Sequence, residues 1–358
     1  MRKFNVGIVG ATGMVGQRFI SLLSDHPWFD IALLSASERS AEKPYAQAVS
    51  GRWAMDTPLP EAAAGMMVHD AMDINAAKAL DFVFCAISLD KALTKELEES
   101  YAKTEIPVVS NNSAHRGTPD VPMLMPEINA EHMDVIPYQR KRLGTSRGFI
   151  AVKPNCSIQT YVPALHPLRD FGIEQIAACT YQAISGAGKT FETWPEMIDN
   201  VIPYIGGEEQ KSEQEPLKAW GRIENGIIVN ADKPVITSQC IRVPVTDGHM
   251  AATFVKFASK PPIDEIKSRW AGFKALPQHL ALPSAPAQFL QYFEEDARPQ
   301  TRLDRDNGNG MAVSIGRLRE DAIFDYKFVC LSHNTLRGAA GGAVLMAELL
   351  AAKGYFDR

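Results

Sequence analysis

The feature that most constrains the fold is a glycine-rich segment near the start of the chain, GIVGATGMVG at residues 7–16. Gly7, Gly10, Gly13 and Gly16 lie between a strand-like apolar stretch, FNVGIVGA, and the periodic, helix-like MVGQRFISLLSDH. Glycine permits a tight turn at such a junction and lets backbone amides approach a diphosphate at the helix N-terminus. The spacing G-x-x-G-x-x-G departs from the commonest dinucleotide motif. It predicts a nucleotide-binding turn, and a glycine needed only for the bend is the alternative.

Strand-like and helix-like segments alternate through the first 110 residues. Apolar runs such as DIALLSAS and LDFVFCAIS are separated by helix-like stretches such as DKALTKELEESYAK, which indicates βαβ units and a parallel sheet. After residue 150 longer β-like runs, such as EQIAACTYQAIS and HMAATFVKFAS, predict a second, mixed or antiparallel sheet. Residues 277–310 are rich in proline, charge and asparagine-glycine, and they predict a loop that serves as a lid or an oligomer contact.

The chain length of 358 residues allows two domains that each bury a core. We predict an α/β protein with a Rossmann-type nucleotide-binding domain at residues 1–152 and a second, α+β domain at residues 153–332 that carries the catalytic and substrate-binding groups. The alanine- and leucine-rich end, NTLRGAAGGAVLMAELLAAKGY, has helical spacing. We expect a helix within residues 333–358 to pack back on the first domain, so that the chain crosses between domains twice.

Charge and hydropathy exclude two classes of partner. The chain has 37 basic and 42 acidic residues, a formal net charge of −5 and no basic block that could follow a phosphate backbone, which argues against nucleic acid. No apolar run approaches the roughly 20 residues that cross a bilayer, since Glu348 interrupts GGAVLMAELLAA. The first residues have the charge pattern of a signal peptide, but the glycine-rich segment runs through them. We therefore expect a cytoplasmic protein with no membrane partner.

The five cysteines include one with an unusual setting. Cys85, Cys179, Cys240 and Cys330 lie inside strand-like apolar runs, where a cysteine acts as a small buried hydrophobe. Their spacing argues against a disulfide framework and against a zinc site, so no metal is expected. Cys156 instead lies in KPNCSIQT, after an apolar run and before a helix-like segment. This position predicts a free thiol at the amide end of a helix.

A cysteine nucleophile needs an accessible thiolate, stabilised by a helix N-terminus or an imidazole. Pro163 must kink or shorten the helix after Cys156, and amides at its start could hold an oxyanion. Of eight histidines, His249 stands out because it follows Arg242 by seven residues across a TDG turn in IRVPVTDGHMA. A hydrogen-bonding loop histidine is the alternative. We expect an ionised, low-pKa Cys156 with His249 beside it.

Three further histidines, His26, His132 and His279, lie in polar or proline-flanked stretches and are expected at the surface.

Several basic side chains are candidates for binding anions. Arg242, Arg116 in NNSAHR and Lys211 in GEEQKS suit carboxylate or phosphate recognition, with surface salt bridges as the alternative.

The second predicted strand ends in SASER, the position that usually separates the two nicotinamide cofactors. Ser35 and Ser37 offer hydroxyls, and Arg39 with Lys43 offers positive charge, which favours NADP. Glu38 could serve NAD instead, and a solvated turn is the alternative for the whole segment.

Several of these segments, in this order, resemble the aspartate-β-semialdehyde dehydrogenase family. The resemblance runs nearly end to end through GIVGATGMVGQRF, VVSNNSAHR, KPNCSIQT, TYQAISGAGK, RVPVTDGH and NTLRGAAGG, and its form is closer to the archaeal and fungal branch. It implies that L-aspartyl 4-phosphate and NADPH react to give L-aspartate 4-semialdehyde, NADP and phosphate. This step is shared by lysine, threonine and methionine biosynthesis. A homodimer or homotetramer joined through the second domain is also implied.

The resemblance also implies roles for individual residues. Cys156 would be the nucleophile, His249 the general acid and base, Gln182 would orient the acyl group, and Asn155 would steady the nucleophile. Substrate binding would fall to Arg242 for the carboxylate, Glu208 for the ammonium group, and Arg116 with Lys211 for the phosphate. The cofactor would be lined by Gly10, Thr12, Gly13, Met14, Val15, Ser35, Ala36, Ser37, Arg39, Ser185, Gly186 and Asn334.

Two alternative functions remain open at this point. One is another reductase of the same architecture, such as N-acetylglutamyl-phosphate reductase or a phosphorylating glyceraldehyde-3-phosphate dehydrogenase, although their cysteine motifs differ from PNCSIQT. The other is a non-catalytic nucleotide-binding scaffold. The presence of Cys156, His249, Arg242 and Gln182 together argues against a scaffold.

Overall fold

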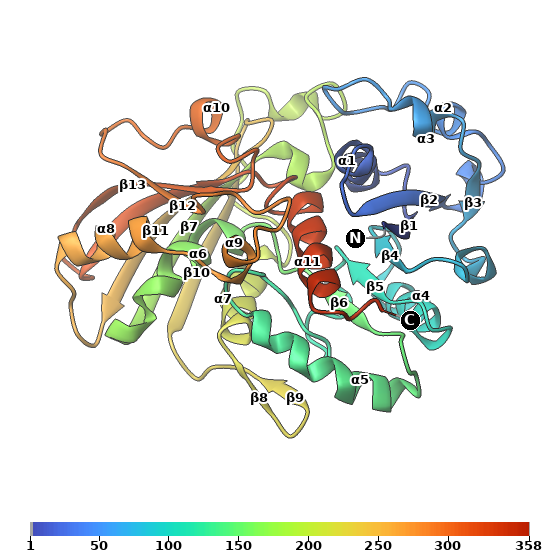
Figure 1. The fold of residues 1–358 in the computed structure, drawn as a ribbon. Coiled ribbons are helices and arrows are strands. Elements are labelled where there is room, and N and C mark those ends of the chain that lie inside the picture. Colours follow the sequence, from blue (N-terminus) through green and yellow to red (C-terminus); the bar gives the residue numbers. More distant parts are fainter. Residues whose placement is uncertain (1–2, 358) are drawn as a thin grey trace.

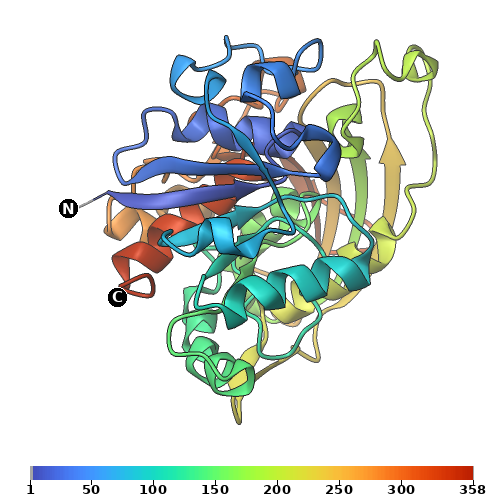
Figure 2. The same ribbon diagram turned by 90° about the vertical axis from the view of Figure 1, so that its right-hand side faces the viewer.

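The first half of the chain forms a fully parallel six-stranded sheet with helices around it (Figures 1 and 2). The computed structural model describes residues 3–357. The strand order is β3-β2-β1-β4-β5-β6, the order of doubly wound dinucleotide-binding folds, whose ligand crevice lies where the order reverses, between β1 and β4. The strands are β1 (Phe4–Val9), β2 (Phe29–Ala36), β3 (Val68–Asp70), β4 (Phe82–Cys85), β5 (Val108–Ser110) and β6 (Ile150–Val152).

The two helices predicted for this half, α1 and α4, are present. Helix α1 starts at Met14, directly after the glycine-rich segment, and α4 is capped by the Asp90 carboxylate, which accepts hydrogen bonds from the amides of Ala92 and Leu93. The helices are α1 (Met14–Leu23), α2 (Tyr45–Ala48), α3 (Glu61–Ala64), α4 (Lys91–Lys103) and α5 (Ile136–Leu143), and the 3₁₀ turns are η1 (Glu38–Ser40), η2 (Ile74–Ala77) and η3 (Ala130–Val135).

The second half forms a mixed six-stranded sheet of order β10-β7-β11-β14-β13-β12, as predicted for this region. Its strands are β7 (Ile173–Gln182), β10 (Val235–Arg242), β11 (His249–Phe257), β12 (Leu290–Phe293), β13 (Val313–Glu320) and β14 (Tyr326–Ser332), and β8 (Arg222–Glu224) pairs separately with β9 (Ile227–Val229). The remaining elements are α6 (Ile158–Leu165), α7 (Glu208–Ala219), α8 (Ile263–Gly272), α9 (Leu276–His279), α10 (Thr301–Asp304), η4 (His166–Phe171), η5 (Ile184–Ala187) and η6 (Pro195–Met197).

One face of this second sheet is covered and the other is open. Helices α6, α7 and α8 pack on the covered face, where Trp270 of α8 contacts the ring of Phe328 of β14. The side chains that alternate with the covered ones are only partly buried, as expected for a face without a helical cover. On the central strands Gln175, Lys256 and Lys327 lie toward one end of this face, and its apolar side chains are Ala177, Cys179, Tyr181, Met250, Ala252, Phe254 and Val329. We call this set the open sheet face.

The last helix, α11 (Ala340–Ala352), joins the core of the first half, where it packs against α1. Residues 340–351 are all buried, which suits a helix that is apolar on every side. Figure 1 shows this red helix between the two sheets. Glu348, which interrupts its apolar run, is also buried, and it accepts a hydrogen bond from the Ser284 amide (3.0 Å) and pairs with His26 (2.9 Å).

Three expectations from the sequence are wrong. Residues 277–310 are not a plain loop, because β12 within them completes the edge of the second sheet. His26 and His132 are buried rather than at the surface, because His26 stacks on Phe29 and pairs with Glu348, while His132 bonds to Asn129 and to the Gly221 carbonyl. His279 is exposed.

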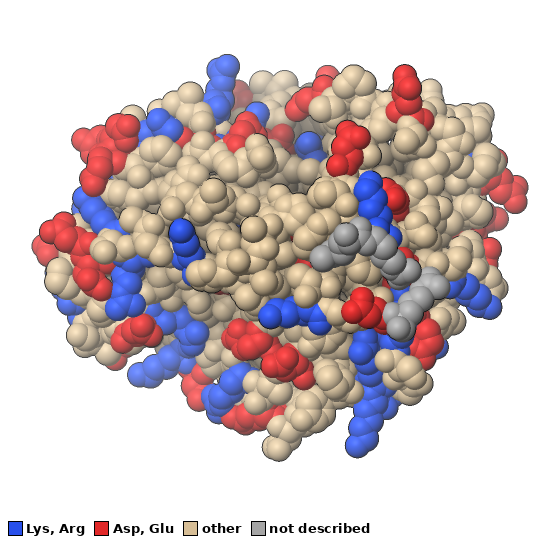
Figure 3. Space-filling view, viewed as in Figure 1, with Lys and Arg blue, Asp and Glu red and all other residues tan. Residues whose placement is uncertain are grey.

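Charged side chains of both signs are interspersed over the face shown in Figure 3. Within residues 3–357, no helix has the length and apolar character that a membrane span requires.

Candidate active site

A cavity of about 550 Å³ lies where the two halves of the molecule meet. The first half contributes the start of α1 and the segments after β5 and β6, and the second half contributes the ends of β7 and β10, part of η5 and one side of α7. The segment after β14 closes it. The lining residues are Met14, Val15, Asn111, Asn112, Ser113, Arg116, Lys153, Asn155, Cys156, Gln182, Ser185, Gly186, Ala187, Gly188, Ile205, Glu208, Lys211, Arg242, Asn334, Thr335, Gly338 and Ala339.

Cys156 lies just before α6 and faces His249, the first residue of β11. The Sγ atom of Cys156 is 3.4 Å from Nε2 of His249. Pro163 is contained in α6, which is only eight residues long. The Asn155 side chain fixes the turn, because its Oδ1 accepts hydrogen bonds from the amide and the hydroxyl of Ser157, both 2.7 Å. The turn therefore holds the thiol at the amide end of a short helix.

Burial favours the neutral form of both reactive groups. Burial raises the pKa of the Cys156 thiol, and the nearby Glu208 carboxylate raises it further. Burial, followed by the charge of Arg242, lowers the pKa of the His249 imidazole to about 3. The expectation of an ionised, low-pKa thiol is therefore wrong for this state, because the cost of desolvating the thiolate exceeds the effect of the surrounding cations.

Gly186 lets His249 and Arg242 lie close to the loop after β7. A Cβ atom at residue 186 would lie 3.0 Å from Cε1 of His249 and 3.1 Å from Nη1 of Arg242. That Nη1 donates a hydrogen bond to the Ala183 carbonyl (2.7 Å), and the Ala183 amide donates to Nδ1 of His249 (3.1 Å). One short loop thus positions both the imidazole and the guanidinium.

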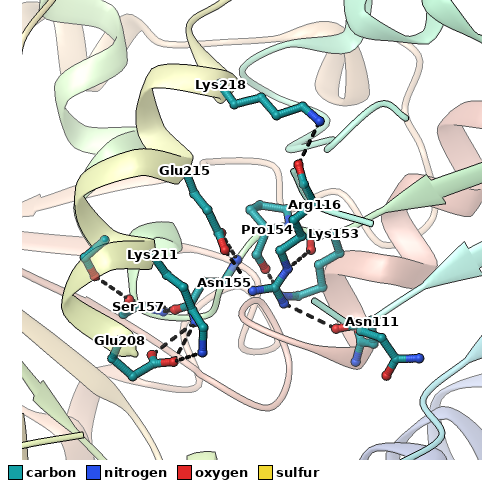
Figure 4. A network of polar contacts seen from close by, with 12 residues as sticks. Asn111, Arg116, Lys153, Pro154, Asn155, Ser157, Glu208, Lys211, Glu215 and Lys218 are labelled. Carbon is teal, nitrogen blue, oxygen red and sulfur yellow. Dashed lines mark hydrogen bonds and ion pairs between the residues drawn. The ribbon is translucent and has the colours of Figure 1, made fainter. Parts of the chain in front are cut away.

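Helix α7 presents a row of charged side chains to the site (Figure 4). The Glu208 carboxylate accepts hydrogen bonds from Lys211 (2.6 Å), Asn155 (3.1 Å) and Gln182 (3.1 Å). Glu208 and Lys211 are three residues apart on α7, and this spacing places both side chains on one face of the helix. Glu208 therefore holds the side chains of three other predicted site residues.

Arg116 is engaged on all sides in this structure. Its Nη1 pairs with Glu215 (3.0 Å), its Nε donates to the Lys153 carbonyl (3.0 Å), and its Nη2 donates to the Asn111 carbonyl (3.3 Å). Glu215 also accepts a hydrogen bond from the Asn155 amide (2.6 Å). The guanidinium is thus held beside the turn that carries Cys156, and the Glu215 carboxylate is its anionic partner.

Comparisons with known proteins agree with this architecture. The family model for "Semialdehyde dehydrogenase, NAD binding domain" matches residues 5–136, and that for "Semialdehyde dehydrogenase, dimerisation domain" matches residues 165–337. The aspartate-semialdehyde dehydrogenase of Schizosaccharomyces pombe is 45% identical over 98% of both chains. That of Methanothermobacter thermautotrophicus is 43% identical over 97% of this chain and 98% of its own. The chain belongs to the aspartate-semialdehyde dehydrogenase family.

Solved structures of aspartate-semialdehyde dehydrogenases share the whole fold. The Candida albicans enzyme, solved with NADP, is 39% identical, with a TM-score of 0.88 over 99% of each chain. Aspartate-semialdehyde dehydrogenase II from Vibrio cholerae is 26% identical, with a TM-score of 0.75 over 98% of this chain and 99% of its own. The higher identity to archaeal and fungal relatives agrees with the branch that the motifs indicate.

In this aspartate-semialdehyde dehydrogenase family member, the glycine-rich segment forms a close-packed cradle. Gly10 has φ +91°, and a Cβ there would lie 2.6 Å from the Ala86 carbonyl oxygen, while one on Gly16 would lie 2.2 Å from the Gly10 oxygen. Gly13 is exposed at the start of α1, and Met14 with Val15 lines the cavity, while Thr12 is partly buried beside them. The cradle fits a diphosphate, because the glycines let these backbone segments pack closely at the amide end of α1.

The predicted cofactor residues at the end of β2 differ in their exposure to solvent. Ser35 and Ala36 are buried, and the Ser35 hydroxyl has no hydrogen-bond partner among the described residues. Ser35 acts instead through its carbonyl, which accepts hydrogen bonds from the amides of Gly10 and Ala11. Ser37 and Arg39 are exposed. Only these last two are placed to reach a ligand at the surface.

Asn334 and Ser185 close the cavity from the second half of the chain. Nδ2 of Asn334 donates to the Ser185 hydroxyl (2.8 Å), and its Oδ1 accepts from the Gly248 amide (2.7 Å), directly before His249. Gly338 allows this segment to contact the nucleophile, since a Cβ there would lie 2.8 Å from Cβ of Cys156.

Sequence reasoning missed several residues that line the cavity, among them Lys153 and Asn112. Asn112 donates a hydrogen bond to the buried carboxyl group of Glu98 (2.9 Å), which Ser110 also contacts (2.5 Å). Burial raises the pKa of Glu98. Lys153 is 3% exposed and directly follows β6. The available signal for Lys153 was a charged residue that directly follows a fully apolar strand in the KPNC motif.

Proposed function

We propose that this protein is an NADP-dependent aspartate-semialdehyde dehydrogenase, which reductively dephosphorylates L-aspartyl 4-phosphate to L-aspartate 4-semialdehyde. This step serves lysine, threonine and methionine biosynthesis. The observation that carries the proposal is the 3.4 Å contact of Cys156 with His249 in a cavity lined by both halves of a chain that is 45% identical to a named relative. Neither half would form this cavity alone.

The chemistry follows from the thiol and the imidazole. The sulfur of Cys156 attacks the acyl carbon of aspartyl phosphate, a C–S bond forms, the bond to the phosphate oxygen breaks, and phosphate leaves. NADPH, when bound, supplies the hydride that reduces the acyl group. His249 gives a proton to the oxygen of the tetrahedral species and takes it back as the C–S bond breaks. The products are the aldehyde and the free sulfur of Cys156.

Four charged side chains would orient the substrate. Arg242 would bind the carboxylate at one end, and Arg116 with Lys211 the phosphate at the other, so that only one carbonyl faces the sulfur. Glu208 would accept the ammonium group. In this structure Arg116 and Lys211 pair with Glu215 and Glu208, so we expect the substrate to exchange with these internal partners.

Two residues would shape the immediate surroundings of the sulfur. Gln182 would orient the acyl group, since its Oε1 is buried and has no partner among residues 3–357. Asn155 would keep the turn of the nucleophile fixed through Ser157.

The cofactor side of the cavity would be formed by the glycine cradle and the segments opposite it. Its proposed residues are Gly10, Thr12, Gly13, Met14, Val15, Ser37, Arg39, Ser185, Gly186 and Asn334. Ser35 and Ala36 would act by supporting the cradle, because both are buried beneath it. The positive charge of Arg39 favours the 2′-phosphate of NADP.

A homodimer formed through the open sheet face is the proposed assembly, and a pair of such dimers is a further possibility. The face is apolar, and it lies in the domain that the family model describes as a dimerisation domain. We propose that the protein acts in the cytoplasm on small-molecule substrates.

Substitution of the nucleophile tests the proposed function. The assay is phosphate-dependent reduction of NADP by aspartate semialdehyde, the reverse reaction. Cys156→Ala should abolish turnover and leave the dissociation constant of NADP within about twofold, because the thiol makes the covalent bond but does not hold the cofactor. Cys179→Ala, which removes a half-buried thiol on the open sheet face, is the matched control and should retain activity.

Three outcomes would contradict the proposal. Residual Cys156→Ala activity within tenfold of the parent would remove the covalent mechanism. Faster turnover of N-acetylglutamate semialdehyde or glyceraldehyde 3-phosphate would favour a different reductase of the same fold. Nucleotide binding without turnover of any of these aldehydes would favour a scaffold.

A further inference from the structure

Lys153 is a buried basic residue in the active-site cavity to which the proposed reaction gives no role. It follows β6 and precedes the turn that carries Cys156, and it is 3% exposed. Its backbone is fixed at both ends, since its amide donates to the Ser110 carbonyl (2.9 Å) and its carbonyl accepts from Nε of Arg116 (3.0 Å). The side chain therefore has little freedom to leave the site.

The Lys153 side chain has neutral partners only. Its Nζ donates to the Pro154 carbonyl. When the Gln159 amide is oriented so that its nitrogen donates to the Arg337 carbonyl (3.1 Å), its oxygen lies 3.2 Å from Nζ and accepts a second bond. An ammonium group carries three donors. One donor is left over, and Lys153 forms no ion pair within residues 3–357.

The other cations around the sulfur are already engaged. Arg116 pairs with Glu215, and Nη1 of Arg242 donates to the Ala183 carbonyl. Arg337 is fully buried in an ion pair with Glu127. Lys153 differs from Arg116 and Arg337 because no carboxylate pairs with it, although Glu215 lies near enough to act on it, and it differs from Arg242 because it directly follows β6 in the segment that carries Cys156.

The hydrogen bonds of His249 limit what the imidazole can do for the thiol. Nδ1 accepts a hydrogen bond from the Ala183 amide, so it carries no proton. The proton of the neutral ring therefore resides on Nε2, which points at Sγ of Cys156. In this tautomer His249 donates to the sulfur and cannot receive the proton of the thiol. A thiolate would gain a hydrogen bond from the ring but no counter-charge.

We propose that Lys153 is a positioning residue for the nucleophile, whose buried ammonium group supplies the counter-charge that stabilises the thiolate of Cys156. In net terms the thiol loses a proton and the neutral amine form of Lys153 gains it, so that thiolate and ammonium form together, and the charge of His249 does not change in this step. The inference rests on the proposed function, because it explains how the nucleophile of that reaction is generated.

The electrostatics of the site agree with this assignment. Burial, and then the charge of Arg116, lower the pKa of Lys153 to about 7, so the amine can take up a proton near neutral pH. Cys156 raises the pKa of Lys153, and Lys153 is the foremost of the cations that lower the pKa of the thiol. Each ionisation therefore favours the other.

The test measures the reactivity of Cys156 without turnover. The full-length protein is alkylated with iodoacetamide from pH 6 to 10, and the peptide that contains Cys156 is quantified by mass spectrometry. Lys153→Met should slow alkylation roughly tenfold at pH 8 and move the midpoint of the rate profile up by about one pH unit, the size expected for loss of a nearby buried charge. Lys153→Arg should keep the midpoint within about 0.3 unit.

Two further variants complete the design. Lys91→Met, which removes an exposed lysine at the start of α4, should behave as the parent. His249→Gln should shift the midpoint by less than about 0.5 unit if the ring is neutral, whereas loss of an imidazolium partner would shift it by more than about one unit.

The proposal is overturned if folded Lys153→Met protein, checked by circular dichroism and NADP binding, gives the parental pH profile. If Lys153→Met does not fold, the His249→Gln profile decides, and a large upward shift there overturns the proposal. Because alkylation needs no substrate, absent turnover together with the expected profiles would count against the proposed function alone.

Discussion

At the scale of single residues, the site depends on burial as much as on residue type. Cys156 and His249 lie in contact, but burial raises the pKa of the first and lowers that of the second. Desolvation acts against both charged forms, so burial favours a neutral thiol beside a neutral imidazole. The sequence motifs identify both residues, yet their protonation states depend on neighbours such as Glu208 that lie more than 40 positions away in the chain.

Gly186 offers a test of how closely the imidazole is positioned. In Gly186→Ala the added methyl group would lie 3.0 Å from Cε1 of His249, so the ring must move by a few tenths of an ångström. We expect kcat to fall roughly tenfold, because small displacements of reacting groups have large effects on rate. Steady-state kinetics measures the effect, and the thermal midpoint should change little.

Gly206→Ala is the control for this substitution, because nothing lies within 4 Å of a Cβ at residue 206. Equal kcat values for the two variants would show that the contact between residue 186 and the imidazole does not matter for turnover.

At the scale of elements, α7 is the helix whose burial the sequence does not predict. Its EEQKSEQEPLK pattern is typical of a solvated helix, yet Glu208, Glu215 and Lys218 are buried. Lys218 donates hydrogen bonds to three carbonyls after β5, those of Arg116 (2.7 Å), Thr118 (2.8 Å) and Val121 (2.9 Å). A helix with so few apolar residues can be buried because tertiary partners satisfy its charges.

The end of β2 should determine which nicotinamide cofactor is preferred. Arg39 is exposed there beside Ser37. Arg39→Gln should raise the KM for NADPH roughly tenfold and leave that for NADH within twofold, because only NADPH carries the 2′-phosphate. The two kcat/KM ratios measure the effect.

Glu38→Gln is the companion variant at this position. If Glu38 binds a ribose hydroxyl, this change should raise the KM for NADH and leave the KM for NADPH unchanged. If Arg39→Gln lowered kcat/KM equally for NADPH and NADH, the charge of Arg39 would not determine which cofactor is preferred.

At the scale of the whole molecule, the active site exists only because the chain crosses between its two halves twice. The segment after β6 carries Cys156 into the second half, and the segment after β14 returns past Gly338 to α11 in the core of the first. The cavity lies at these crossings. The buried Arg337–Glu127 ion pair joins the segment after β14 to the segment between β5 and η3 of the first half.

The assembly can be tested on the open sheet face. Ala252 lies in the middle of β11, opposite Cys179 on one side and Val329 on the other. Ala252→Asp should convert a dimer into monomers, because a charge buried in an apolar interface has no partner. Sedimentation velocity measures the mass of the assembly, and circular dichroism verifies the fold.

Ile323→Asp, at a side chain that is 85% exposed, is the control and should not change the assembly. A parent protein that sediments as a monomer, or an Ala252→Asp variant that stays dimeric, would exclude this face as the interface.

The sequence by itself determined the parallel sheet, the glycine cradle and the unusual position of Cys156. These depend on short-range patterns, namely the alternation of apolar residues and the steric freedom of glycine, which neighbouring residues settle locally. The tertiary structure alone decided that Arg116 pairs with Glu215, that His132 is buried and that Lys153 lies beside the nucleophile. Desolvation and Coulomb interactions depend on which distant groups fold against one another, and no local pattern records that.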